Sequence, residues 1–206
     1  MGELEKALAE ITLIRSQIAR GTEFRGLGAP TLAATGVLAL LAAAAQALWL
    51  EAPARHVAAY LALWLGVAAV SIILIGIQTV TRSARIHSGL AQEMILAAVE
   101  QFLPAAAAGA LLTAVLFQVD WAVLWMLPGL WQIVFSLGIF ASRRALPPAI
   151  VLPGLWYLAT GLACLAFAGG TQAFSPWAMG LPFGIGQALI AAVIAHRHGG
   201  ETDGQA

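Results

Sequence analysis

Charged residues are scarce in this sequence. Asp, Glu, Lys and Arg make up 10% of its 206 residues, whereas 61% are hydrophobic. Soluble domains carry about 25% charged residues, and a chain of this length leaves much of its surface exposed to solvent. A soluble domain is therefore excluded as the fold class, because its surface would have to consist of apolar side chains. The composition indicates an integral membrane protein, whose solvent is the lipid bilayer.

Features that would identify a function class are also missing. The net charge is zero, so electrostatic attraction to nucleic acid is not expected. The only cysteine, Cys164, lies in an apolar run, cannot form an internal disulfide, and is interpreted as a small buried apolar residue. The sequence contains no nucleophile elbow, phosphate-binding glycine loop or zinc signature. We therefore expect no enzyme activity and no resident cofactor.

Six apolar segments are long enough to cross a bilayer, which requires about 20 predominantly apolar residues. They are residues 30–50, 57–80, 95–118, 121–141, 149–168 and 176–196. Polar or turn-forming stretches separate them, the longest running from Thr81 to Glu93. The shortest is Val119-Asp120, so the third and fourth spans should form a tight helical hairpin. The sequence thus predicts an all-α fold with a six-helix transmembrane bundle over residues 26–198.

The positive charges are divided unequally between the two sides of these spans. If the spans alternate in direction, one side receives Arg55 alone. The other side receives Lys6, Arg15, Arg20, Arg25, Arg82, Arg85, Arg143, Arg144 and Arg197. Lys and Arg are enriched in cytoplasmic loops. The distribution predicts an inner (plasma) membrane protein with both termini in the cytoplasm.

An amphipathic segment precedes the first span. Within residues 1–25, apolar side chains recur at steps of three and four while charged residues fill the other faces, as in a surface helix. The apolar stripe consists of Leu4, Leu8, Ile11, Ile14 and Ile18. We expect a cytoplasmic helix that packs on the inner leaflet or on the inner loops. The alternative is that Leu8, Ile11, Ile14 and Ile18 dock a cytoplasmic partner or a second copy.

The two ends of the chain carry further expectations. Residues 2–25 lack the continuous apolar region of a cleavable signal peptide, so the first span should act as the insertion signal. Residues 199–206 are polar and glycine-rich, which predicts a disordered cytoplasmic tail.

Small residues recur along two spans in a pattern that favours close helix packing. In lipid, apolar burial does not drive helices together, so close backbone approach contributes instead. The sixth span has Gly180, Gly184 and Ala188 at every fourth position, and the third span has Gly109. Packing within the chain is one interpretation, and the seam of a homodimer is the other.

Glu100 is the carboxylate most plausibly placed inside a span. It lies next to Gln101, and Pro104 cannot donate the hydrogen bond that the Glu100 carbonyl would otherwise accept. Ionisable residues at membrane depth are costly and often functional. Glu100 is therefore a candidate proton or cation site, or alternatively an interfacial carboxylate that pairs with an inner arginine.

Two glutamines near the middle of their spans extend this candidate path. Gln132 follows Pro128, and Gln187 follows Pro182. If they share one depth, the two amides could bind each other or a ligand. An interhelical hydrogen bond, worth around 1 kcal/mol, explains each amide equally well. Gln46 and Gln78 lie at other depths and are assigned no role.

A metal or haem site is a minor alternative. His87, Glu93 and His196 would all lie on the cytoplasmic side, where they could meet. The main hypothesis is a non-enzymatic regulatory or complex-forming subunit that binds a protein partner through its cytoplasmic helix and inner loops. The alternative is a small-solute or ion carrier that uses Glu100, Gln101, Gln132 and Gln187.

Overall fold

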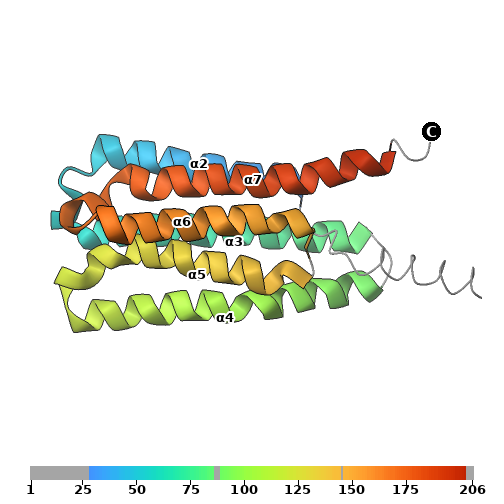
Figure 1. Cartoon of the computed structure of the whole chain (residues 1–206), viewed down its shortest axis with the longest axis horizontal. Helices are drawn as coiled ribbons and strands as arrows, with labels where there is room; N and C mark the ends of the chain where they lie inside the picture. The colour runs from blue at the N-terminus through green and yellow to red at the C-terminus, as the bar shows by residue number, and fades with distance from the viewer. Residues whose placement is uncertain (1–27, 86–88, 145, 203–206) are drawn as a thin grey trace, which may run out of the picture.

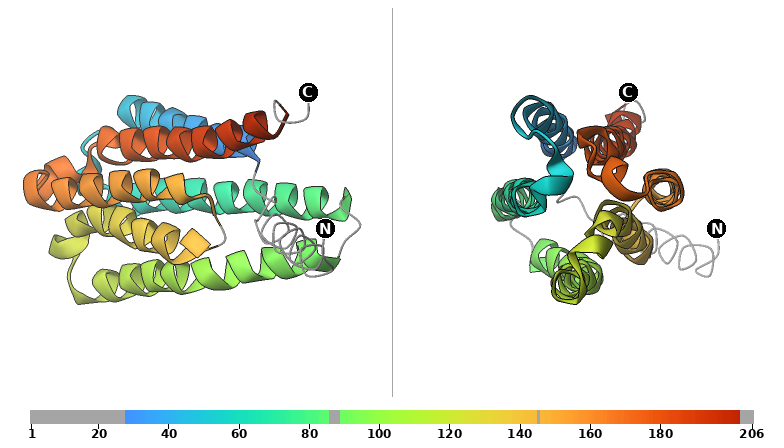
Figure 2. Two further views of the ribbon diagram at one scale, coloured as in Figure 1. Left: turned by 45° about the vertical axis from the view of Figure 1, so that its right-hand side comes forward. Right: turned by 90° about the vertical axis from the view of Figure 1, so that its left-hand side faces the viewer.

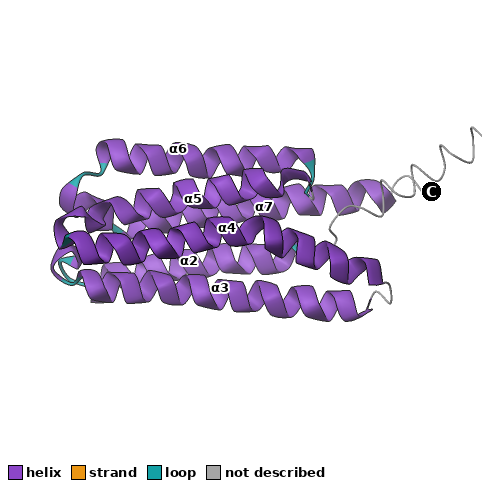
Figure 3. Cartoon of the chain, turned by 90° about the horizontal axis from the view of Figure 1, so that it is seen from below, coloured by secondary structure: helices purple, strands orange, loops and turns teal. Residues whose placement is uncertain are grey.

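The computed structural model describes residues 28–85, 89–144 and 146–202, and the secondary structure within these ranges is entirely helical (Figure 1). Six helical stretches are long and apolar enough to cross a membrane, which confirms the predicted fold class at that level. The main helices are α2 (Ala29–Trp49), α3 (Val57–Arg85), α4 (Gly89–Val119), α5 (Leu127–Ala141), α6 (Val151–Phe167) and α7 (Pro176–Thr202). Figure 3 shows them running side by side along the molecule.

Short 3-10 turns join the helices at one end of the bundle. They are η1 (Pro53–Arg55), η2 (Trp121–Met126) and η5 (Gly170–Phe174), while η3 (Ser142–Arg144) and η4 (Pro148–Ile150) lie between α5 and α6. Asp120 begins η2, because its Oδ1 accepts a hydrogen bond from the backbone N of Ala122 at 2.9 Å. The turn returns the chain along α4, so the tight hairpin predicted for the third and fourth spans is present.

The helices are longer than the predicted spans at the opposite end. α3 continues to Arg85 and α4 begins at Gly89, so most of the predicted polar break between Thr81 and Glu93 is helical. α7 likewise extends to Thr202, whereas we predicted a disordered tail from Gly199. Helical hydrogen bonds are local, so a helix need not end where its apolar stretch ends. The predicted N-terminal helix lies outside the described residues.

The six helices form a ring when viewed along their axes (Figure 2). Around it the order is α2, α7, α6, α5, α4 and α3. The closest seams are α2 with α7 and α5 with α6. The first joins two spans that are far apart in the sequence, and the second joins two consecutive spans. The seam between α3 and α4 is the weakest, although these helices follow one another in the chain.

Glycines account for the closeness of the two tightest seams. On α7, a Cβ at Gly180 would lie 2.4 Å from the Ala43 Cβ of α2. On α6, a Cβ at Gly161 would lie 2.8 Å from the Gly129 backbone oxygen of α5. Neither position admits a larger residue unless the backbones separate, as expected where small residues allow close approach.

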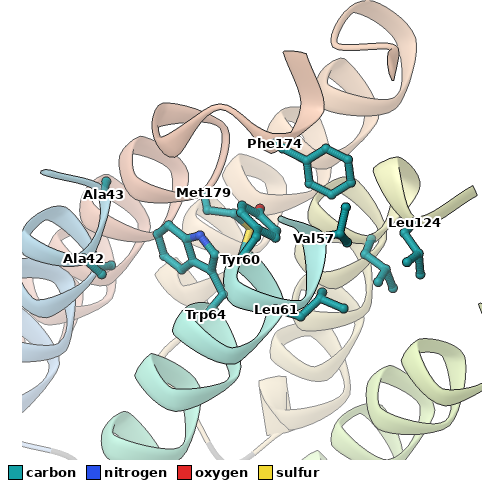
Figure 4. Packing of buried hydrophobic residues seen from close by; sticks show 11 residues of the cluster. Ala42, Ala43, Val57, Tyr60, Leu61, Trp64, Leu124, Phe174 and Met179 are labelled. Carbon is teal, nitrogen blue, oxygen red and sulfur yellow. The ribbon is translucent and has the colours of Figure 1, made fainter. Parts of the chain in front are cut away.

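The buried apolar side chains form two clusters, one in each half of the bundle. The cluster near η5 joins six elements and includes Tyr60, Trp64, Phe174 and Met179, which face one another in Figure 4. The cluster in the other half is built around Tyr157, with isoleucines of α5 and α7. Over residues 100–119, the part of α4 whose side chains are described, the helix supplies no buried member to either cluster, so this part lies at the edge of the core.

Candidate functional site

The polar side chains in the interior form the candidate functional site, because the sequence analysis placed any ligand path among them. The buried ones are Thr35, Gln46, Thr79, Gln132, Ser136, Ser142 and Gln187. Burying a polar group is costly unless it is hydrogen-bonded. The partners of each side chain therefore indicate whether it holds the fold together or remains free to bind something else.

Gln132 is fully buried and repairs a break in the hydrogen bonding of α7. Pro182 has no N–H, so the Ala178 carbonyl lacks its normal helical donor. Gln132 of α5 supplies the bond, since its Nε2 donates to the Ala178 carbonyl at 2.9 Å and to the Pro128 carbonyl at 3.1 Å. From α6, Trp156 Nε1 donates to the Pro182 carbonyl at 3.0 Å. Side chains from two helices thus bind α7 on both sides of its proline.

Gln187 lies at a different height from Gln132. It is nine residues beyond Ala178 on α7, which corresponds to about 13 Å along a helix. Its neighbours are Gly36 of α2, where a Cβ would lie 3.0 Å from the Gln187 Cβ, and the hydroxyl of Tyr157. The two amides therefore have separate surroundings, and the expectation that they share one depth is not met.

Glu100 is exposed, at the start of the apolar stretch of α4. The level of Gln132 on α5 corresponds to Gly109 and Thr113 on α4, because Val134 faces Gly109 and Trp131 Nε1 donates to Thr113 Oγ1 at 2.8 Å. Glu100 precedes Gly109 by nine residues, or about 13 Å of helix. The structure therefore does not bring Glu100 together with Gln132.

Gln101, beside Glu100, is half-buried. Its Oε1 has no hydrogen-bond partner within the described part of the chain. The next residue, Phe102, packs against Gly138 of α5, where a Cβ would lie 2.5 Å from the ring. Gln101 thus lies near the α4–α5 seam, well away from Gln187.

Two of the three predicted metal or haem ligands cannot be placed in the described region, so that site stays a prediction. His87 lies outside it, as does the side chain of Glu93, and His196 is exposed on α7. Among the described residues, no three His, Cys, Asp or Glu side chains are grouped closely enough to hold a metal ion.

The candidate packing and docking residues have different outcomes. Gly180 and Gly184 pack on α2 within the chain, whereas Ala188 is exposed. Gly109 faces Val134 of α5 at van der Waals distance. The candidate docking residues of the N-terminal segment, Leu8, Ile11, Ile14 and Ile18, lie outside the described residues, so their role stays a prediction.

Gln46 has a structural role that the sequence analysis missed. Its Nε2 donates to the Phe174 carbonyl, and its Oε1 accepts from Trp64 Nε1, both at 2.8 Å. The amide thereby ties α2 to α3 and to η5. The sequence does show a glutamine and a tryptophan within neighbouring spans, which are residue types that can form a hydrogen bond. It does not show that the two side chains face each other.

Tyr60 and Tyr157, the only two tyrosines of the chain, were missed as well. Both are fully buried, and neither hydroxyl has a hydrogen-bond partner among the described residues. Tyrosines at a membrane are enriched at the interface. The position of Tyr157 inside a span, away from the interface, could therefore have marked it as an unusual buried polar residue.

Other proteins offer no assignment for this arrangement. Comparison of the chain with protein-family models, with curated proteins and with solved structures found no match.

Proposed function

We propose that this chain is a non-enzymatic subunit of a protein complex in the inner membrane, with both termini in the cytoplasm. The observation that carries the proposal is the low burial of α3 and α4. In the most apolar stretch of α4 no residue is buried, and in that of α3 17% are, against 33–50% in the other four spans. A second protein in the membrane would find its largest free surface here.

Two glycines on α3 support this assignment. A Cβ added at Gly66 or Gly76 would meet nothing within 4 Å, so neither glycine is needed for packing within the chain. Glycine inside a helix costs stability relative to alanine. Glycines on a membrane helix are favoured where another helix approaches closely. A partner helix along α3 would explain why both positions lack a side chain.

The carrier alternative has less support from the interior. Both polar atoms of the Gln46 amide and the Nε2 of Gln132 are occupied by hydrogen bonds, whereas the Gln132 Oε1 has no partner among the described residues. Glu100 is exposed, lies about 13 Å of helix from the level of Gln132, and belongs to α4, which does not adjoin the α7 helix of Gln187 in the ring. A carrier requires polar side chains that converge on one path, and these residues lie at separate positions.

Native electrophoresis of the full chain, extracted from its own membrane with a mild detergent, tests the proposal. We expect the wild type to migrate as a complex larger than the monomer, and Gly66→Leu and Gly76→Leu to lose that form while keeping the melting temperature of the monomer. Ala188→Leu, an exposed small residue on α7, is the matched control and should keep the complex. A wild type that migrates as a monomer, or glycine variants that retain the larger form, would contradict the proposal.

The cytoplasmic part of the proposal concerns orientation and the N-terminal segment. A reporter active only in the cytoplasm should function when fused after Ala206 and fail when inserted near Asp120. Changing Ile11 and Ile14 together to Asp should release a cytoplasmic partner without unfolding the six helices. A double variant that fails to insert would show instead that this segment belongs to the core packing.

A further inference from the structure

The exposed aromatic side chains are confined to one end of the bundle. Among the residues whose side chains the structure describes, the most exposed rings are those of Phe167 and Trp49, at 84% and 83%. Each exposed ring lies within one turn of the point where a helix meets η1, η2 or η5, the turns that share this end (Figure 1). We call these residues the aromatic belt: Trp49, Phe117, Trp121, Phe167 and Trp177.

The aromatic belt is spread around the ring of helices. Its members belong to α2, α4, η2, α6 and α7, and α4 lies across the ring from α7 and α2 (Figure 2). A protein partner that docks on one side of the bundle would cover only part of such a set, because the anchor residues of a protein interface cluster in one patch. A lipid surface surrounds the bundle and can contact every member.

The chemistry of the exposed side chains changes with height along the bundle. Beyond the aromatic belt, the turns carry the exposed charged residues Glu51, Arg55 and Asp120. Within the spans, the large exposed side chains are aliphatic, such as Ile72 and Leu111. The apolar stretch of α4 that ends beside the belt has 20 residues, or about 30 Å of helix, which matches the hydrocarbon core of a bilayer. Aliphatic, then aromatic, then charged is the order expected across a membrane–water interface.

The indole N–H groups distinguish the belt from the interior. Three tryptophans inside the bundle donate from Nε1 to a group on another helix. The Nε1 atoms of Trp49, Trp121 and Trp177 donate to no residue in the described part of the chain. Hydrocarbon offers no acceptor for them, whereas the ester and phosphate oxygens of phospholipids do. A ring with one apolar side and one free donor therefore fits the headgroup boundary.

We propose that the aromatic belt anchors the η1, η2 and η5 end of the bundle at the boundary between phospholipid headgroups and hydrocarbon. The proposal rests on the membrane location given under Proposed function and adds the level at which the bilayer ends. The rings lie among the upper acyl carbons, and the indole N–H groups donate to ester or phosphate oxygens. In the proposed orientation this is the outer leaflet.

Quenching of tryptophan fluorescence by brominated phosphatidylcholine tests the depth of the belt. The full chain is reconstituted in vesicles whose lipid carries bromine either near the headgroup or near the bilayer centre. The shallow bromine should be the stronger quencher of the belt, and the combined Trp49→Phe, Trp121→Phe and Trp177→Phe variant should lose most of the shallow quenching. Trp125→Phe is the matched control and should retain it, because Trp125 lies in η2 but packs against the core.

The possible outcomes separate this proposal from the membrane location itself. Shallow quenching that persists in the triple variant, or belt fluorescence quenched most by bromine near the bilayer centre, would overturn the proposal while leaving the chain in the membrane. Belt fluorescence quenched by aqueous iodide but by neither lipid would also overturn it. A chain that does not float with the vesicles would overturn the membrane location as well. If the triple variant does not fold, each single Trp→Phe variant should lose part of the shallow quenching.

Discussion

Helices α7 and α4 each contain a proline within an apolar span, but the two prolines lie in opposite surroundings. Pro182 of α7 is buried. The Ala178 carbonyl, which Pro182 leaves without a helical donor, and the Pro182 carbonyl each accept a hydrogen bond from a side chain of another helix. Pro104 of α4 is exposed, and the carbonyl that it deprives belongs to Glu100, which is exposed as well. The same local break is thus supported by tertiary contacts in α7 and left on the surface in α4.

The contrast extends to the whole ring. α2, α5, α6 and α7 meet through glycines and buried amides, so each of these helices depends on its neighbours. α3 and α4 leave wide faces uncovered, and their mutual seam is the weakest of the ring. One part of the bundle is therefore packed internally, and the other has little buried surface, where we propose that a partner binds. The following predictions test that difference, from the largest expected effect to the smallest.

Glycine-to-alanine substitutions should have opposite effects in the two regions. Gly161→Ala places a Cβ 2.8 Å from a backbone oxygen of α5, which should destabilise the fold by about 1–3 kcal/mol. Gly76→Ala meets open space and should instead stabilise its helix by about 0.5–1 kcal/mol. Unfolding of both variants in detergent provides the measurement. Equal effects at the two sites would remove the proposed distinction between the regions.

Gln132→Leu should destabilise the wild type because it leaves the Ala178 carbonyl without a donor. The expected cost is about 1–3 kcal/mol. In a Pro182→Ala background the restored N–H can bond that carbonyl, so the same substitution should cost less. The coupling is measured as a double-mutant cycle of unfolding free energies.

Ser136→Ala is the matched control for this cycle. Ser136 is also buried on α5, but its Oγ donates to the Ile133 carbonyl of its own helix. Ser136→Ala should change the free energy of unfolding by the same amount in the wild type and in the Pro182→Ala background. If Gln132→Leu also costs the same in both backgrounds, its bond to the Ala178 carbonyl does not compensate for the proline.

Thr113→Val should loosen the attachment of α4. The substitution leaves Trp131 Nε1 without the hydroxyl to which it donates, and interhelical hydrogen bonds of this kind contribute about 0.6 kcal/mol on average in membranes. Thr160→Val is the control, because Thr160 bonds only to carbonyls of its own helix. A melting temperature that falls equally in both variants would show that the bond to Trp131 contributes nothing specific.

Glu100→Gln should have the smallest effect on stability, within about 0.5 kcal/mol, because the side chain is exposed. The same variant separates the two functional hypotheses. A complex-forming subunit should retain its assembly, whereas an ion carrier should lose flux in proteoliposomes while keeping its fold. Proton- or cation-coupled flux in the wild type that disappears in Glu100→Gln would favour the carrier.

The helical fold class and the six apolar stretches could be predicted because they depend on local properties. The apolar runs end at Leu50, Val119 or Gly169, where turn residues or charges follow, and the structure places turns close to these points. The extension of α3 to Arg85 and of α4 from Gly89 was not predicted, because polar residues such as Arg85 and Gln92 are as compatible with a helix as with a loop.

The hydrogen-bond partners of the buried polar side chains, in contrast, could not be predicted from local properties. Gln132, Gln187 and Gln46 look alike in the sequence, since each is one amide in an apolar run. The structure binds Gln132 to α7, connects Gln46 to Trp64 and Phe174, and leaves the Gln187 oxygen beside Tyr157. Each outcome depends on which residues of distant helices lie at the same height.

The sequence by itself therefore determined the number of candidate spans, their approximate limits and the residues that break them, because hydropathy and hydrogen bonding within a helix are local. The tertiary structure decided the order of the helices around the ring, which glycines are pressed against a neighbour and which face outward, and which proline is supported. The physical reason is that helix packing within apolar surroundings has no strong sequence signal. It depends on close approach and a few hydrogen bonds between residues far apart in the chain.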